Sequence, residues 1–231
     1  MIFDTDLVEA TLVRRYKRFL ADVVLPDGSE VTAHCPNPGA MIGLCAPGSK
    51  VYLLPGKGKL PWSWELVERP EGLIGINTNR PNTLVAEALA ADAIPELSGY
   101  DVIRREVPYG VNSRIDFLLE GSGRPPAYVE VKNVHLVREP DMAEFPDCVT
   151  ARGAKHLVEL SAMVAAGGRA VMLYVVQLDF CRNFALAGDY DPAYLRAFRA
   201  AKDAGVEAYA YDCQVDKKGL RLMRPMRILD R

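Results

Sequence analysis

Two runs of alternating apolar and polar residues near the middle of the chain predict a pair of neighbouring strands. Residues 128–133 run Tyr-Val-Glu-Val-Lys-Asn, and this period of two is typical of a half-buried strand. Side chains on a strand alternate between its faces, so Glu130 and Lys132 share one face while the two valines share the buried one. Residues 113–119 form a second run of this kind, and a Gly/Pro-rich segment at 121–126 separates the two. The pattern predicts a hairpin.

The predicted hairpin brings polar side chains together. Folding the second strand back onto the first places Asp116 beside Glu130. Asp116 lies in an otherwise apolar run, where an unpaired carboxylate is costly to bury. We therefore expect Asp116, Glu130 and Lys132 to converge on one spot. A Glu and a Lys two residues apart also fit an ordinary surface ion pair, and the pattern leaves both interpretations open at this point.

Short apolar runs separated by turn signals fill the first part of the chain. Between residues 9 and 68 these runs alternate with Gly/Pro turns at 26–29, 36–39 and 55–59. Residues 13–25 form one long run with Arg14, Tyr16 and Arg18 on one face. About five strands in a segment of this length predict an OB-like β-barrel, which we assign to residues 1–70.

OB-like barrels often bind single strands of nucleic acid through cations and aromatic rings on one face. The cations of this half that are candidates for such binding are Arg14, Lys17, Arg18, Lys57 and Lys59, beside the aromatic residues Tyr16, Trp62 and Trp64. The alternative, that Trp62 and Trp64 fill the barrel or the domain junction, stays open because large aromatic side chains dominate small cores.

The rest of the chain, residues 71–231, predicts a second domain of mixed α/β (α+β) type. A helix at 82–91 carries Glu87 beside its apolar stripe, and a strand at 100–108 precedes the hairpin. A loop at 138–147 follows, and then a helix at 149–166 and a strongly apolar strand at 169–177. The predicted order is αβββαβ. A further helix at 192–204 and a strand at 206–213 extend it.

Composition narrows the class of protein. The chain has 231 residues, of which 49% are hydrophobic and 25% charged, so it is globular and long enough for two domains. A net charge of −2 and a pI near 6.0 exclude a generally basic protein, so a nucleic-acid surface must be a local patch. The five scattered cysteines include no CxxC, which favours reduced thiols. With no signal peptide and no membrane-spanning run, we expect a cytoplasmic protein without a membrane partner.

The arrangement of acidic and basic residues on these elements resembles the PD-(D/E)xK nuclease superfamily. Glu87 lies on the first helix, Asp116 on the second strand, and Glu130 and Lys132 on the third. Hard oxygen ligands from Asp116 and Glu130 suit Mg²⁺ or Mn²⁺, which activates water for attack on a phosphodiester. The resemblance implies that Lys132 orients or helps to deprotonate that water and that Glu87 completes the site. Three residues near the start of the 149–166 helix would hold the phosphate backbone: Arg152, Lys155 and His156.

A longer set of motifs is similar to the sugar fermentation stimulation protein A family over most of the chain, about residues 9–225. The stretches that carry this similarity are His34-Cys35-Pro36-Asn37-Pro38-Gly39-Ala40-Met41, Trp62-Ser63-Trp64-Glu65-Leu66, Asn77-Thr78-Asn79-Arg80-Pro81-Asn82, Ser113-Arg114-Ile115-Asp116-Phe117-Leu118, Glu130-Val131-Lys132-Asn133-Val134, Phe145-Pro146-Asp147 and Thr150-Ala151-Arg152-Gly153-Ala154-Lys155-His156. The resemblance implies a prokaryotic, cytoplasmic, DNA-binding protein linked to regulation of sugar (maltose) metabolism. It predicts no particular oligomeric state.

Three functions remain open on this basis. The first is a metal-dependent nuclease acting on DNA, with RNA as a second substrate class. The second is a catalytically silent nucleic-acid-binding regulator that keeps the nuclease fold. The third is a sugar-responsive or protein-interaction module without affinity for nucleic acid. The complete set of Asp116, Glu130 and Lys132 favours the first, although a fold does not by itself imply a function. No helix-turn-helix pattern is present, which disfavours sequence-specific repression of that type.

Overall fold

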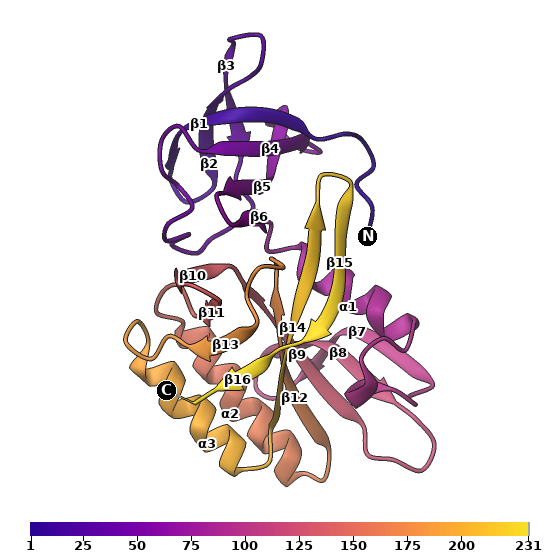
Figure 1. Cartoon of the computed structure of the whole chain (residues 1–231). Helices are drawn as coiled ribbons and strands as arrows, with labels where there is room; N and C mark the ends of the chain where they lie inside the picture. Colours follow the sequence, from indigo (N-terminus) through magenta and orange to yellow (C-terminus); the bar gives the residue numbers. More distant parts are fainter. Residues whose placement is uncertain (231) are drawn as a thin grey trace.

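The computed structural model describes residues 1–230 and has two parts, a barrel and a larger α/β unit (Figure 1). The barrel strands are β1 (Val8–Tyr16), β2 (Leu20–Val24), β3 (Glu30–His34), β4 (Lys50–Pro55), β5 (Trp62–Arg69) and β6 (Gly72–Gly75). Their order in the sheet is β3-β2-β1-β4-β5-β6, and β3 also pairs with β5 in parallel. That pairing closes five strands into the OB-like barrel that the sequence predicts.

Apolar side chains on alternate positions fill the barrel. Leu12, Val23, Val51 and Leu53 are buried, and Trp64 lies among them. The indole Nε1–H of Trp64 donates a hydrogen bond to the Leu66 carbonyl at 2.8 Å. Trp64 is therefore a core residue and unavailable for stacking on a base, which corrects that candidate role. For Trp64 the alternative that it fills the barrel is confirmed, because a small barrel needs large side chains to fill its core.

The second unit is built on a six-stranded sheet in the order β15-β14-β12-β9-β8-β7. Its strands are β7 (Val102–Tyr109), β8 (Ser113–Glu120), β9 (Ala127–Val134), β12 (Arg169–Val176), β14 (Glu207–Asp216) and β15 (Gly219–Pro225). The helices are α1 (Arg80–Ala90), α2 (Ala151–Ala165) and α3 (Pro192–Asp203), with a short 3₁₀ turn at Pro95–Leu97. The order α1-β7-β8-β9-α2-β12 confirms the predicted αβββαβ arrangement.

Helices cover both faces of this sheet. On one face Leu84 and Val85 of α1 pack in a cluster with Phe117 and Val129. On the other face Leu157 and Leu160 of α2 belong to a cluster that also contains strand residues such as Met172. This second cluster continues into the barrel as far as Trp64 and Val67, so one apolar core crosses the domain junction. Since Glu130 and Lys132 lie on the face opposite Val129, they point towards α2.

Two segments differ from the sequence expectation. The long run at 13–25 is a hairpin, in which β1 and β2 turn at Lys17 and Arg18 with φ of 47° and 64°. The segment at 138–147, expected as a loop, contains parts of two strands of a small sheet in the order β10-β11-β13-β16. Those strands are β10 (Leu136–Glu139), β11 (Met142–Phe145), β13 (Asn183–Leu186) and β16 (Arg227–Leu229). Within residues 1–230 no helix is long and apolar enough to cross a membrane.

Candidate metal centre

Asp116 and Glu130 meet where the β8–β9 ladder ends. The last residue pair next to them is Phe117 and Val129, so Asp116 and Glu130 lie one step beyond it. Beyond the last backbone pair, the Asp116 side chain links β8 to β9, because its Oδ2 accepts a hydrogen bond from the Val131 N–H at 2.7 Å. Its Oδ1 accepts from the amide of Asn82 on α1, also at 2.7 Å. The predicted convergence of the two carboxylates is thus present in the structure.

The Glu130 carboxylate has one fully used oxygen and one unused oxygen. Its side chain is only 4% exposed, and Oε1 accepts from Lys132 Nζ at 2.6 Å. Oε1 also receives a hydrogen bond from Nδ1 of His156 on α2. Since Arg152 donates to Nε2 of the same imidazole at 3.3 Å, the His156 proton lies on Nδ1. Oε2 of Glu130 is buried and has no hydrogen-bond partner among residues 1–230.

The two carboxylates have opposite pKa shifts. Burial, followed by repulsion from Glu130, raises the pKa of Asp116 above its ordinary value, although hydrogen bonds from Val131 and Asn82 oppose this. Burial also acts to raise the pKa of Glu130. There the hydrogen bond from His156 and the charge of Lys132 outweigh it, and the net pKa is lowered. Glu130 is therefore the ionised partner, and Asp116 resists a second negative charge beside it.

This donor set fits a hard divalent cation. Magnesium takes oxygen ligands, commonly from one or two carboxylates, and keeps several waters. Glu130 Oε2, which has no partner within residues 1–230, supplies a buried anionic oxygen. A cation next to it would offset the burial and relieve the repulsion from Glu130 that together raise the pKa of Asp116. Within the described residues no group of three or more His, Cys, Asp or Glu side chains forms a metal site. A site at this position therefore depends on two carboxylates with water completing the shell.

Glu87 lies apart from this pair, contrary to the sequence expectation. Its side chain is 53% exposed and accepts a hydrogen bond from the Met1 ammonium group at 2.6 Å. It lines a surface hollow with residues of β15. The residue of α1 that reaches the carboxylates is Asn82. Successive residues of a helix are about 100° apart, so Asn82 and Glu87 differ by about 140° around the axis and flank the apolar stripe on opposite sides.

Two further side chains near the pair were missed by the sequence analysis. Tyr109, at the end of β7, has a buried hydroxyl without a hydrogen-bond partner among residues 1–230. Burial, with repulsion from Glu130, Glu159 and Asp116, raises the pKa of this phenol well above its usual range. Glu159 of α2 is buried and accepts from the Val111 N–H at 3.1 Å, while its Oε2 has no partner in the same range. A signal for Glu159 was available, since it lies three residues after His156 on the buried face of α2.

The basic residues of α2 have different surroundings. Arg152 contacts His156, as described above, and its own side chain is exposed. Lys155 donates to the Val111 carbonyl at 2.8 Å and lies 3.5 Å from Glu159. Of the three predicted phosphate-holding residues on this helix, His156 makes direct contact with the carboxylate pair, and Arg152 reaches it through His156.

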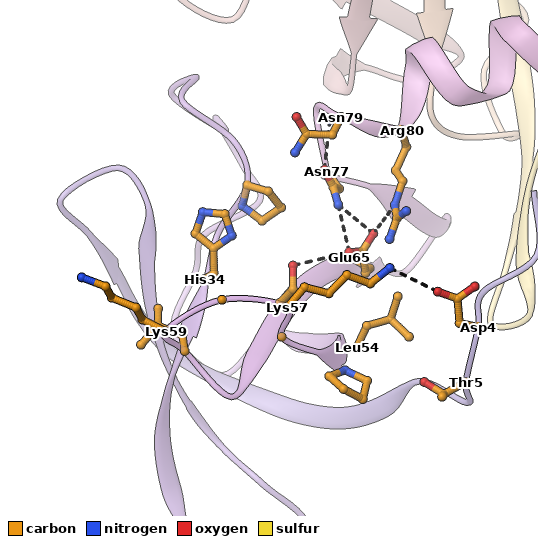
Figure 2. Close-up of a pocket in the computed structure, with 16 residues that line it drawn as sticks. Asp4, Thr5, His34, Leu54, Lys57, Lys59, Glu65, Asn77, Asn79 and Arg80 are labelled. Carbon is orange, nitrogen blue, oxygen red and sulfur yellow. Dashed lines mark hydrogen bonds and ion pairs between the residues drawn. The ribbon is translucent and has the colours of Figure 1, made fainter.

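The five barrel cations fall into two groups. Arg14 pairs with the buried Asp22 at 2.8 Å, Lys17 is exposed in the β1–β2 turn, and Arg18 donates to the Pro38 carbonyl at 2.9 and 3.1 Å. Lys57 and Lys59 lie elsewhere, in the loop between β4 and β5. There they line a cavity between the barrel and the start of α1 (Figure 2), which we call the junction cavity; its lining also includes His34, Glu65, Asn77 and Arg80. The hairpin cations take no part in that lining.

Fold and site together define a two-domain protein in which an OB-like barrel precedes a mixed α/β domain that carries a largely buried pair of carboxylates. The chain belongs to the sugar fermentation stimulation protein family. The model of the SfsA N-terminal OB domain matches residues 13–76, and the model of the sugar fermentation stimulation protein RE domain matches residues 79–219.

Relatives of similar length support this assignment. A sugar fermentation stimulation protein homolog from Azorhizobium caulinodans is 60% identical over 229 residues, covering 96% of this chain and 97% of the relative. The homolog from Jannaschia sp. is 58% identical over 231 residues, covering 98% and 96%. Among solved structures, that of Pyrococcus furiosus SfsA in complex with Ca²⁺ is similar, with a TM-score of 0.91 and 27% identity. The matched region covers all of this chain and 98% of the Pyrococcus furiosus chain.

Proposed function

We propose that this chain binds nucleic acid, with DNA as the first candidate, and hydrolyses phosphodiesters with Mg²⁺ or Mn²⁺ held by Asp116 and Glu130. The observation that carries the proposal is that the two oxygens of the Glu130 carboxylate make different contacts. Lys132 and His156 both use Oε1, which leaves the buried Oε2 without a partner among residues 1–230, beside a second carboxylate. The Ca²⁺ complex of the Pyrococcus furiosus relative supports a divalent-cation site in the family, because Ca²⁺ also prefers oxygen ligands.

The bound ion would supply Lewis acidity at the phosphoryl oxygen and lower the pKa of water. The chain's own residues supply position and charge. Lys132 is held by Glu130 and is 15% exposed, so its ammonium can contact a phosphate oxygen or hold the attacking water. His156 fixes the Glu130 carboxylate from the other side, and Arg152 fixes the imidazole. Arg152 and Lys155 are exposed at the start of α2, where they can contact the phosphate backbone.

Cellular context follows from two further features. All five cysteines are free thiols, which supports a cytoplasmic location. The name of the family associates it with sugar fermentation. We infer that a role in regulating sugar (maltose) metabolism would act through the nucleic-acid site.

A cleavage assay tests the proposal. Labelled single-stranded DNA, double-stranded DNA and RNA are incubated in EDTA and then in Mg²⁺ or Mn²⁺, with the wild type and with Asp116→Asn, Lys132→Ala and Glu87→Gln. We expect ion-dependent cleavage by the wild type, which Asp116→Asn abolishes. Asp116→Asn should also bind more tightly in EDTA, because a negative charge near the phosphate is gone. Lys132→Ala should weaken both binding and cleavage.

Glu87→Gln is the matched control, because it removes a carboxylate of the same domain that lies away from the pair. Its activity should equal that of the wild type. Cleavage by Asp116→Asn would show that the activity belongs to another site. If the wild type binds one of these nucleic acids without cutting it, the chain is a catalytically silent nucleic-acid-binding regulator and the nuclease proposal is wrong.

A further inference from the structure

The junction cavity has the size and mixed lining of a ligand site. Its volume is about 720 Å³, within the range of about 300–1,000 Å³ that is usual for small-molecule sites. Apolar surface comes from Pro36, Leu54 and Leu60, and polar groups come from both the barrel and the start of α1. Figure 2 shows Glu65, Asn77 and Arg80 gathered together, with the Lys57 side chain extending past Glu65 in this view towards Asp4 and Lys59 lying apart from them. Several of the motifs that mark the family thus meet at a place separate from the carboxylate pair.

Arg80 is held in a way that leaves part of its guanidinium available. Glu65 is 2% exposed, and its Oε2 accepts from Arg80 Nε at 2.8 Å. Both oxygens of Glu65 also accept from the amide of Asn77, at 2.9 and 3.0 Å. The two terminal nitrogens of Arg80 make no hydrogen bond within residues 1–230. A guanidinium fixed at Nε presents its remaining planar fork, which matches the oxygens of a phosphate.

The charge of the lining favours an anion. Three cations (Lys57, Lys59 and Arg80) face two acids (Asp4 and Glu65), which leaves one net positive charge in a chain whose net charge is −2. Lys57 lies 3.3 Å from Asp4, and both side chains are highly exposed, so this pair is weak and a phosphate can displace it. A nucleotide matches this lining, because its phosphate can contact the cations while its base and sugar contact the apolar wall and the amides.

The start of α1 links the cavity to the carboxylate pair. Arg80 lines the cavity and Asn82, two residues later in the first turn of α1, holds Asp116. These two residues are about 3 Å apart along the helix axis and about 160° apart around it, so they lie on different sides of the first turn. A second connection runs through Gln177, whose amide donates to the Asn77 carbonyl at 3.1 Å and to Asn133, next to Lys132, at 2.5 Å. A strand that passes the carboxylates can therefore reach the cavity by crossing the first turn of α1.

We propose that the junction cavity binds one nucleotide unit of the nucleic-acid strand, with its phosphate on Arg80 and its base inside the cavity. This inference rests on the proposed function, since it assumes that a strand passes Asp116 and Glu130. It gives the barrel a specific task, which is to select strands that carry an accessible base.

The test compares a short single-stranded DNA of mixed sequence with an abasic strand of equal length, both in EDTA, where cleavage is absent. The proteins are the wild type, Arg80→Lys, Ser63→Leu and Lys202→Gln. Arg80→Lys keeps a cation for Glu65 but removes the fork. Ser63→Leu adds bulk to the lining, because the Ser63 hydroxyl already points at Glu65 from 3.4 Å. Lys202→Gln removes an exposed charge on α3, away from the cavity.

We expect the wild type and Lys202→Gln to bind the normal strand at least about tenfold more tightly than the abasic strand. Ser63→Leu should lose this preference while keeping the wild-type affinity for the abasic strand. Arg80→Lys should bind both strands more weakly, because both carry the phosphate that Arg80 contacts. Unfolding temperatures confirm the fold of both variants. If Ser63→Leu keeps the preference, the cavity does not hold the base. If neither strand binds the wild type, the proposed function itself fails.

A final experiment uses free nucleotides in place of strands. The four deoxynucleoside monophosphates are titrated separately by calorimetry into the wild type and Ser63→Leu. Loss of their binding in Ser63→Leu together with loss of the strand preference supports the assignment. Loss of free-nucleotide binding with an unchanged strand preference would overturn it in favour of a site for a free nucleotide.

Discussion

At the scale of single residues, the two carboxylates of the pair have different roles because their surroundings differ. Glu130 is kept ionised by Lys132 and His156, whereas burial and the charge of Glu130 hold the pKa of Asp116 above its ordinary value. An acid whose folded pKa is raised costs stability at neutral pH, because the folded protein resists its ionisation. A cation at this position removes that cost, so metal binding and folding stability should be coupled.

The first prediction follows from this coupling. Saturating Mg²⁺ or Mn²⁺ should raise the unfolding temperature of the wild type by about 5 to 10 °C at about a hundredfold excess over the dissociation constant. Asp116→Asn should be at least as stable as the wild type in EDTA and should gain little from either ion. Thermal unfolding followed by circular dichroism measures both effects. Equal ion-induced shifts in the two proteins would place the ion away from Asp116.

Much of this site could be predicted from the sequence, because a strand has a fixed period of two. That period puts Glu130 and Lys132 on one face, and a short loop brings Asp116 to them. The contribution of α1 could not be predicted in the same way. An apolar stripe fixes which side of a helix is buried, but polar residues flank it on both sides, and sequence does not say which flank faces the strand ends. Asn82 therefore took the place expected for Glu87.

At the scale of elements, the turns of the barrel could be predicted where Gly, Pro, Asn or Asp marks them in the sequence, and could not be predicted where these residues are absent. The β2–β3 turn carries Asp27 and Gly28, with Gly28 at φ 85° and the Asp27 carboxylate accepting from the Ser29 N–H at 2.9 Å. The β1–β2 turn uses Lys17 and Arg18 at positive φ, and no Gly, Asn or Pro marks it. The five cations considered for one binding face of the barrel are divided between this hairpin and the junction cavity.

This division leads to a second prediction, on the salt dependence of binding to nucleic acid. Lys57 and Lys59 are exposed at the junction cavity, whereas the charge of Arg14 is already paired with the buried Asp22. The double change of Lys57 and Lys59 to Ala should flatten the plot of log affinity against log salt by about 1.4 to 1.8. The double change of Arg14 and Arg18 to Ala should flatten it less.

Binding measured by fluorescence anisotropy at several salt concentrations checks this ranking. A larger effect at Arg14 and Arg18 would move the main phosphate contacts to the β1–β2 hairpin. Wild-type slopes in both double variants would show that the main phosphate contacts are at Arg152 and Lys155.

At the scale of the whole molecule, a polar connection joins the two domains beside their shared apolar core. Asp147, which precedes α2, accepts from the Met41 N–H of the barrel domain at 2.8 Å and from His135 Nε2 at 3.2 Å. A Cβ atom at Gly39 would lie 2.5 Å from the Asp147 carboxylate, so only glycine permits this approach. The motifs that contain Gly39 and Asp147 were visible in the sequence. That they meet each other is a tertiary contact that no local pattern encodes.

The third prediction concerns the acid stability of this junction. Burial opposes ionisation of Asp147, but its hydrogen bond with His135 and the other donors lower its pKa to about 2. A carboxyl whose folded pKa is depressed stabilises the protein above its unfolded pKa of about 3.9, and this contribution disappears as the pH falls towards the folded value. Asp147→Asn should cost about 2 kcal/mol of unfolding free energy near neutral pH. The difference from the wild type should shrink from about pH 4 downwards.

Denaturant unfolding of both proteins at a series of pH values measures that difference. A gap that stays constant between neutral pH and about pH 3 would show that the charge of Asp147 does not stabilise the junction.

Anomalous diffraction from crystals grown with Mn²⁺ is the direct test of the proposal that Asp116 and Glu130 together hold a divalent cation. We predict a strong anomalous peak between the two carboxylates, with Glu130 Oε2 among the ligands and oxygen distances of about 2.0–2.3 Å. Crystals of Asp116→Asn grown under the same conditions should lack the peak, while those of Glu87→Gln should retain it. A peak only at Glu87 or elsewhere, or none at the pair in the wild type under saturating Mn²⁺, would show that Asp116 and Glu130 do not hold the ion.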